Sequence, residues 1–151
     1  MPTLKEQLRA DLTAAMKARD ETRTRALRMA LTSITNEEVS GAVARDLTDD
    51  QVTKILNREA KRRREAAAAF ADAGRDEQAA AERAEEDILA SYLPAQLSDD
   101  ELAAIVAAAI TETGASGPAG MGQVMKVVTP RVAGRADGSR VAALVRSQLG
   151  S

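Results

Sequence analysis

The chain has 151 residues, 44% of them hydrophobic, and its 21 basic and 23 acidic residues leave a net charge of −2. It contains no cysteine and no histidine, which excludes disulfides, Cys/His zinc sites and catalysis by Ser-His-Asp or Cys-His sets. Because the overall charge is close to neutral, any binding of nucleic acid must be local. The 32 alanines, with one Phe, one Tyr and no Trp, favour closely packed helices over a sheet.

No targeting segment or membrane span is predicted. The first residues, Met-Pro-Thr-Leu-Lys-Glu, contain no apolar run, and no apolar stretch reaches the length of a membrane-spanning helix. We therefore expect a soluble, cytoplasmic protein without membrane contact.

The first half of the chain is predicted to form about four helices. Apolar residues recur at helical spacing in residues 4–16 and 27–34, with Asp20 between them as a predicted N-cap. Thr48-Asp-Asp-Gln51 is a capping-box pattern that begins a long helix, which Gly74 ends. A fourth helix is predicted from about Asp76 to Leu93. The alanine-rich runs 66–69 and 79–81 are expected on packed or neutral helix faces.

Pro94 separates this half from a second predicted unit. Ser98-Asp-Asp-Glu101 is another capping box at the start of a helix, and a loop of small residues spans 114–120. A short helix with apolar residues at 124, 127 and 128 is predicted to end at Pro130, and Asp137 is predicted to cap a last helix. The sequence thus predicts an all-α protein with an N-terminal helical hairpin or bundle domain, residues 1–93, and a C-terminal three-helix module, residues 94–151.

The densest charge cluster is Arg58-Glu-Ala-Lys-Arg-Arg-Arg64, with five basic residues and one acid. As a positive helix face it would bind phosphates. Alternatively, it pairs with residues 76–87, which hold six acids and one base, across an antiparallel helical hairpin. The opposite signs of the two segments favour pairing, although exposed pairs contribute only about 0–1 kcal/mol each.

Five further basic residues lie in the last third of the chain: Lys126, Arg131, Arg135, Arg140 and Arg146. Five acids balance them in number, but three of these cluster at residues 99–101, which leaves room for a modest basic face. Arginine binds phosphate bidentately. No aromatic residue lies among these bases, so RNA contacts would be to the backbone and its shape rather than to stacked bases.

No catalytic, cofactor or metal site is predicted. The glycines between 114 and 122 lack the Gly-x₄-Gly-Lys-Ser/Thr pattern of a phosphate-binding loop and are better suited to tight turns. The acidic pairs 49–50 and 99–100 lie at predicted helix starts, where helix N-termini favour anions. Together with the acids at 85–87, they are interpreted as structural.

Several short motifs, by their order and spacing, resemble the GatB/YqeY family along nearly the whole chain. In the first half the chain is similar to stand-alone YqeY-like members at Asp11-Leu-Thr-Ala-Ala-Met-Lys17, Leu27-Arg28, Leu47-Thr-Asp-Asp-Gln-Val52, Lys61-Arg-Arg63 and Tyr92-Leu-Pro94. In the second half, Gly122-Gln-Val-Met-Lys126 and Gly134-Arg-Ala-Asp137 resemble the tail domain of the tRNA-dependent amidotransferase B subunit.

The resemblance implies which residues of the C-terminal module contact a partner. In the amidotransferase the tail reaches the body of the tRNA, so Lys126 and Arg135 are expected to contact the tRNA backbone, with Arg131 and Arg140 as further candidates. Gly122 and Gly134 would permit close approach of the tRNA to the protein backbone. Met125 belongs to the same motif as Gly122. Asp137 would cap the last helix and hold Arg135 in place.

Three functions follow as hypotheses. The leading one is a tRNA-binding or amidotransferase-associated accessory protein. The second hypothesis is a helical protein–protein adaptor without nucleic-acid binding, whose apolar groove between the two halves lies near Tyr92, Leu93 and Leu97. The family's carbon–nitrogen ligase activity, with glutamine as amide donor, ranks lowest, because the chain shows no ATP-binding signature and no nucleophile set. The oligomeric state is left open.

Overall fold

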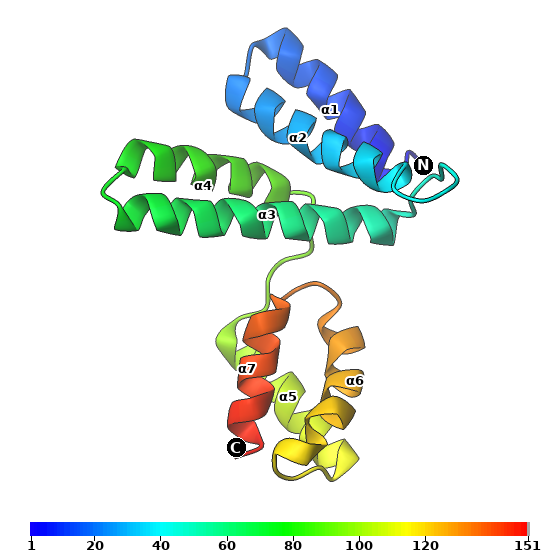
Figure 1. Ribbon diagram of the computed structural model, residues 1–151, viewed down its shortest axis with the longest axis vertical. Coiled ribbons are helices and arrows are strands. Elements are labelled where there is room, and N and C mark those ends of the chain that lie inside the picture. The colour runs from blue at the N-terminus through cyan, green and yellow to red at the C-terminus, as the bar shows by residue number, and fades with distance from the viewer. Residues whose placement is uncertain (151) are drawn as a thin grey trace. The chain divides into compact units, whose positions relative to one another are not determined.

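The computed structural model describes residues 1–150, and all regular structure in this range is helical, which confirms the predicted all-α class. The chain divides into two compact units, Met1–Leu93 and Pro94–Ser151 (Figure 1). Over the described residues, no helix is both long and apolar enough to cross a membrane.

The N-terminal unit consists of two antiparallel helical hairpins (Figure 1). The first pairs α1 (Leu4–Ala18) with α2 (Glu21–Glu38), and the second pairs α3 (Asp49–Asp72) with α4 (Asp76–Ala90). The predicted caps are confirmed: the Asp20 carboxylate accepts from the backbone N–H of Arg23, and Thr48 forms a capping box with Gln51. These caps satisfy N–H groups that a helix leaves without partners at its start.

The α3–α4 hairpin is a close packing of small side chains. Ala60, Ala67 and Ala79 are buried, so the two helix backbones approach each other over most of their length. The α4 helix ends at Ala90, three residues earlier than predicted. Pro94 disfavours the helical conformation at Leu93. The helix is followed by a turn in which the backbone N–H groups of Tyr92 and Leu93 donate to the carbonyls three residues before them.

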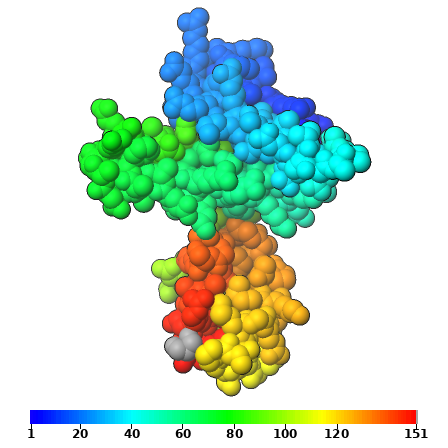
Figure 2. Space-filling model, viewed as in Figure 1, coloured from blue at the N-terminus to red at the C-terminus, as the bar shows by residue number. Residues whose placement is uncertain are grey.

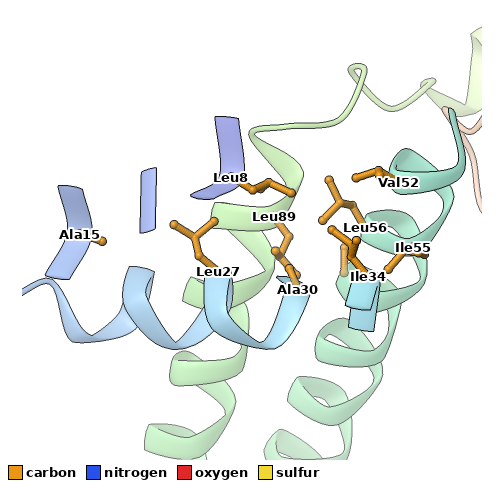
Figure 3. Packing of buried hydrophobic residues seen from close by; sticks show 10 residues of the cluster. Leu8, Ala15, Leu27, Ala30, Ile34, Val52, Ile55, Leu56 and Leu89 are labelled. Atoms are coloured by element: carbon orange, nitrogen blue, oxygen red, sulfur yellow. The ribbon is translucent and has the colours of Figure 1, made fainter. Parts of the chain in front are cut away.

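A single apolar cluster joins the four helices of this unit (Figure 3). It contains leucine, isoleucine, valine and alanine side chains from all four helices: Leu8, Ala15, Leu27, Ala30, Ile34, Val52, Ile55, Leu56, Ala60 and Leu89. The predicted apolar stripes of residues 4–15 and 27–34 therefore point into the core, whereas Met16, which ends the first stripe, is exposed.

The C-terminal unit contains α5 (Asp99–Thr113), a short 3₁₀ helix η1 (Pro118–Gly120), α6 (Met121–Val132) and α7 (Gly138–Gln148). The capping box of Ser98 and Glu101 is confirmed at the start of α5. Its own core is built from Leu97, Leu102, Val106, Ala109, Val124, Val128, Val132, Val141, Val145 and Leu149.

The prediction that Pro130 ends its helix is wrong, because α6 continues through it to Val132. Proline removes one backbone N–H donor, but this position lies in the last turn, where the loss affects a single hydrogen bond. Val128 and Val132, one turn apart, are both buried, and the backbone N–H of Ala133 still donates to the Thr129 carbonyl at 3.1 Å. Core packing on either side of the proline thus holds the final turn.

Candidate nucleic-acid interface

Helix α6 carries the Gly-Gln-Val-Met-Lys motif and divides its residues between core and surface. Val124 and Val128 are buried, Met125 is half-buried against the core, and Lys126 is exposed. Within the described part of the chain, Lys126 has no hydrogen bond or ion pair. A Cβ atom added at Gly122 would meet nothing within 4 Å, so internal packing does not require a glycine there. Gly122 and Lys126 are therefore available to a partner.

Arg131 and Arg135 lie near the C-terminal end of α6, and both already have partners. Arg131 forms an ion pair with Glu112 of α5, and both side chains are about half exposed. Arg135 folds back on the helix, donating from Nη2 to the Arg131 carbonyl at 2.9 Å and from Nε to the Val132 carbonyl at 3.2 Å. A cationic side chain at this end complements the unpaired carbonyls and the negative pole of the helix.

Arg140 binds the segment at the start of the C-terminal unit and is therefore not a free cation. Its Nη1 donates to the Leu97 carbonyl at 3.1 Å, and its Nη2 lies 2.6 Å from the Asp99 carboxylate. The backbone N–H of Leu97 in turn donates to the Arg135 carbonyl at 2.8 Å. The Gly-Arg-Ala-Asp turn and Arg140 thus hold the segment that leads into α5, a structural role that the sequence did not indicate.

The turn between α6 and α7 explains Gly134 and Asp137. Ala133 and Gly134 have φ values of 48° and 78°, both in the left-handed region, which glycine adopts without steric cost. The Asp137 side chain accepts from the backbone N–H of Ser139 and from its hydroxyl, so the predicted cap of α7 is confirmed. Gly134 is needed for the turn itself, whatever the turn contacts.

The four candidate cations do not form one free basic face. Lys126 and Arg131 are five residues apart on α6, which places them about 140° apart around the helix axis. Arg131 and Arg140 pair with acids, whereas Lys126 does not. Between Glu112 and Asp137, however, the sequence contains no acidic residue, so the surface of α6 around Lys126 carries no negative side chain of its own.

A protein-family model described as Yqey-like protein matches residues 5–149, almost the whole chain. The chain belongs to the Yqey-like protein family. A search of curated proteins finds no match. The resemblance of the second half to the amidotransferase B-subunit tail remains a prediction.

This Yqey-like protein places its acidic pairs 49–50 and 99–100 at helix starts, as predicted. Asp49, Asp50, Asp99 and Asp100 lie in the first turns of α3 and α5. The pKa of Glu101 is lowered because its carboxylate accepts hydrogen bonds from the backbone and side chain of Ser98. Among the described residues, no group of three or more acids is arranged to hold a metal ion.

The basic cluster of α3 pairs with α4, which confirms the predicted hairpin interaction. Arg64 lies 2.8 Å from Glu86, and Arg63 lies 3.6 Å from Glu85. The sequence did not reveal that part of this cluster is buried: Glu59, Arg63 and Glu85 are each at most 5% exposed. The spacing of Glu59 and Arg63, one turn apart and in line with buried Ala60 and Ala67, was the available signal.

The buried cluster perturbs both carboxyl groups. Burial alone would raise the pKa of Glu59, but hydrogen bonds from Arg63 and Ser33 and the charges of Arg63 and Arg62 outweigh it, so the pKa is lowered. Burial and the charge of Glu82 raise the pKa of Glu85, with partial compensation from Arg63 and Arg25. The Nε atom of Arg63 is buried without a hydrogen-bond acceptor.

The residues that suggested an adaptor groove pack into the cores of their own units. Tyr92 and Leu93 pack against the N-terminal cluster, and the Tyr92 hydroxyl donates to the Asp11 carboxylate at 2.5 Å. Leu97 is buried in the C-terminal cluster. These three side chains therefore serve folding, and an adaptor would need a different surface.

Proposed function

We propose that this protein binds tRNA, alone or on an amidotransferase, as an accessory protein, with its C-terminal unit in contact with the phosphate backbone. The observation that carries the proposal is Lys126, an exposed cation without an intramolecular partner, inside the motif that resembles the amidotransferase tail. Its surroundings between residues 113 and 136 contain no acid that would repel a phosphate. The family match over residues 5–149 supports the part of the resemblance that concerns Yqey-like proteins.

The paired arginines add to this surface only if phosphate displaces their present partners. The Arg131–Glu112 pair is surface-exposed, and such pairs contribute about 0–1 kcal/mol, so exchange for phosphate costs little. Arg135 donates hydrogen bonds from Nη2 and Nε to carbonyls of α6, which holds its guanidinium at the end of the helix. Arg140 is the least available of the four, because it fixes Leu97. We rank the contacts as Lys126 first, then Arg135 and Arg131, then Arg140.

The experiment is a titration of fluorescently labelled bulk tRNA with the full chain, measured by anisotropy over about 50–200 mM salt. Lys126→Ala should reduce the slope of log affinity against log salt by about 1, and Lys126→Ala/Arg135→Ala by about 2. The matched control is Arg9→Ala/Lys17→Ala, which removes two exposed charges from α1 and should leave the slope unchanged. No binding at the lowest salt, or equal losses in both double variants, would contradict the proposal.

The protein–protein adaptor remains the alternative, and exposed apolar residues favour it. Met16, Met29, Val39 and Val43 of the N-terminal unit are 42–78% exposed. Association through such residues would not weaken with salt. Complex formation with purified amidotransferase that is insensitive to both salt and Lys126→Ala would therefore favour the adaptor over direct tRNA binding.

A further inference from the structure

An open pocket on the N-terminal unit is lined by three cationic side chains. Arg45 comes from the loop 39–48, and Lys54 and Arg58 come from the first half of α3. These segments lie at the surface, cyan to blue-green in Figure 2. Glu37, at the end of α2, is the one acid of the lining, so the pocket holds three positive charges against one negative charge.

The frame of this pocket is fixed by backbone contacts. The backbone N–H of Arg45 donates to the Glu38 carbonyl at 3.0 Å, which holds the loop against the end of α2. At the other end of the loop, the Thr48 capping box starts α3, and the Asp49 carboxylate accepts from the backbone N–H of Leu4 at 3.0 Å. The cations are therefore attached to an ordered backbone.

Lys54 and Arg58 differ from the other basic residues of α3. Further along the helix, each cation from 61 to 64 lies within 4.0 Å of an acid: Lys61 with Glu65, Arg62 and Arg63 with Glu59, and Arg64 with Glu86. Lys54 and Arg58 are exposed, and no acid in the described structure pairs with them. The hairpin contact with α4 thus explains the second half of the basic cluster but not these two.

Their spacing also has no stabilising role. Residues four apart lie on the same helix face, so Lys54 and Arg58 repel each other within the folded protein. Arg45 adds a third positive charge, and its ion pair with Glu37 is 3.4 Å long between half-exposed side chains, which a stronger anion can displace. The three positive charges that line this pocket repel one another, and an anionic ligand would relieve that repulsion.

We propose that this pocket binds a phosphoryl group. Two arginines supply planar forks for phosphate oxygens, and Lys54 supplies a point charge. A volume of about 310 Å³ is enough for a phosphate together with a small attached group. Leu47 and Ile55 line the apolar part of the pocket. Gln51 also borders it, and the Gln51 side-chain oxygen accepts a hydrogen bond from the backbone N–H of Thr48. The phosphate comes either from an RNA backbone or from a small phosphorylated molecule.

This site is independent of the proposed function, because every residue in it belongs to the N-terminal unit. The two sources of phosphate can be separated with two probes. Adenosine monophosphate tests for a free phosphorylated ligand, and a short single-stranded oligoribonucleotide tests for a backbone phosphate.

The experiment is a nuclear magnetic resonance titration of the ¹⁵N-labelled full chain with each probe. Binding should shift the backbone amides of residues 45–58, and Lys54→Gln/Arg58→Gln should weaken it by at least about tenfold, because it removes two charge-assisted contacts. The matched control, Arg62→Gln/Arg64→Gln, removes the same charge from the same helix outside the pocket and should bind as the wild type does. Lys126→Ala/Arg135→Ala should also leave these shifts unchanged, so failure of the tRNA proposal and failure of this one are distinguishable.

Shifts with adenosine monophosphate would assign the pocket to a free phosphorylated ligand, and shifts with the oligoribonucleotide alone would assign it to RNA; either supports the proposal. Absence of shifts at residues 45–58 with both probes would overturn it. Equal loss of binding in the pocket variant and the Arg62/Arg64 control would also overturn it, because the interaction would then be a non-specific effect of net charge. Neither Lys54 nor Arg58 has an intramolecular partner, so the Lys54→Gln/Arg58→Gln variant is expected to fold. Its amide spectrum checks this directly.

Discussion

Replacing Arg63 with methionine should strongly destabilise the N-terminal unit. Arg63 Nη1 donates to the Glu59 carboxylate at 2.9 Å and to the Glu59 carbonyl at 3.0 Å, and its Nε faces Glu85 at 3.6 Å. Methionine fills similar space but leaves two buried carboxyl groups without their shared cation. Removing one partner of a buried ion pair costs about 3–5 kcal/mol. Glu59 keeps Ser33 and Arg62, and Glu85 keeps Arg25, so we expect a loss near the lower end, about 3 kcal/mol.

The stability lost through Arg63→Met should become smaller as the pH falls from about 7 to about 5. The pKa of Glu85 is already raised, so its contribution to stability is present at low pH and is lost as the pH rises through its folded pKa. Without Arg63 this pKa rises further, which adds a penalty at neutral pH that protonation relieves. The pKa of Glu59 is lowered, and its stabilising contribution is present above its unfolded pKa and lost on acidification. Arg63→Met removes part of that contribution, so Glu59 shifts the difference in the same direction, but below the ordinary glutamate pKa of 4.5; the change between pH 7 and 5 comes from Glu85.

Urea unfolding measures the effect, and the chain supplies a probe for the unit concerned. Tyr92 is the only tyrosine, tryptophan is absent, and Tyr92 packs against the N-terminal core, so tyrosine fluorescence reports this unit while circular dichroism reports all helices. Arg62→Met is the matched control, because Arg62 is 64% exposed and its pair with Glu59 should contribute at most about 1 kcal/mol. If Arg63→Met stays within about 1 kcal/mol of the wild type and follows the same pH dependence, the cluster is hydrated in solution and the reasoning fails.

Three further predictions concern individual positions. Asp137→Ala should destabilise the C-terminal unit by about 1 kcal/mol through loss of the α7 cap, measured by urea unfolding with circular dichroism; an unchanged midpoint would mean that solvent replaces the cap. Gly138→Pro should stabilise the same unit by about 0.4–1 kcal/mol in the same assay, because this is the first position of α7 and Asp137, at ψ 135°, already has a conformation that a following proline accepts; a lower midpoint would contradict this. Gly122→Ala should stabilise α6 by about 0.5–1 kcal/mol, since the added Cβ meets nothing, and should weaken tRNA binding if the glycine permits close approach; thermal unfolding and the tRNA titration separate the two effects.

The sequence alone determined the helices and most of their starts. Apolar spacing of 3.6 residues, the side-chain caps at Asp20, Thr48, Ser98 and Asp137, and the break at Gly74 are local signals, because they depend on residues within one turn of each other. The motif order likewise identified the family before the fold was known. Local signals failed at Pro130, where packing on both sides of the proline holds a turn that its ring alone would end.

Only the tertiary structure decided which charges are free. Arg63 and Lys54 belong to one helix and have the same formal charge, yet α4 covers the first and leaves the second exposed. Arg140 and Lys126 were both candidates for phosphate contact, but Leu97 and Asp99 engage Arg140. The opposite charges of two segments predicted that α3 and α4 pair, but not which cations take part, because that depends on which acid the fold brings within about 4 Å of each cation.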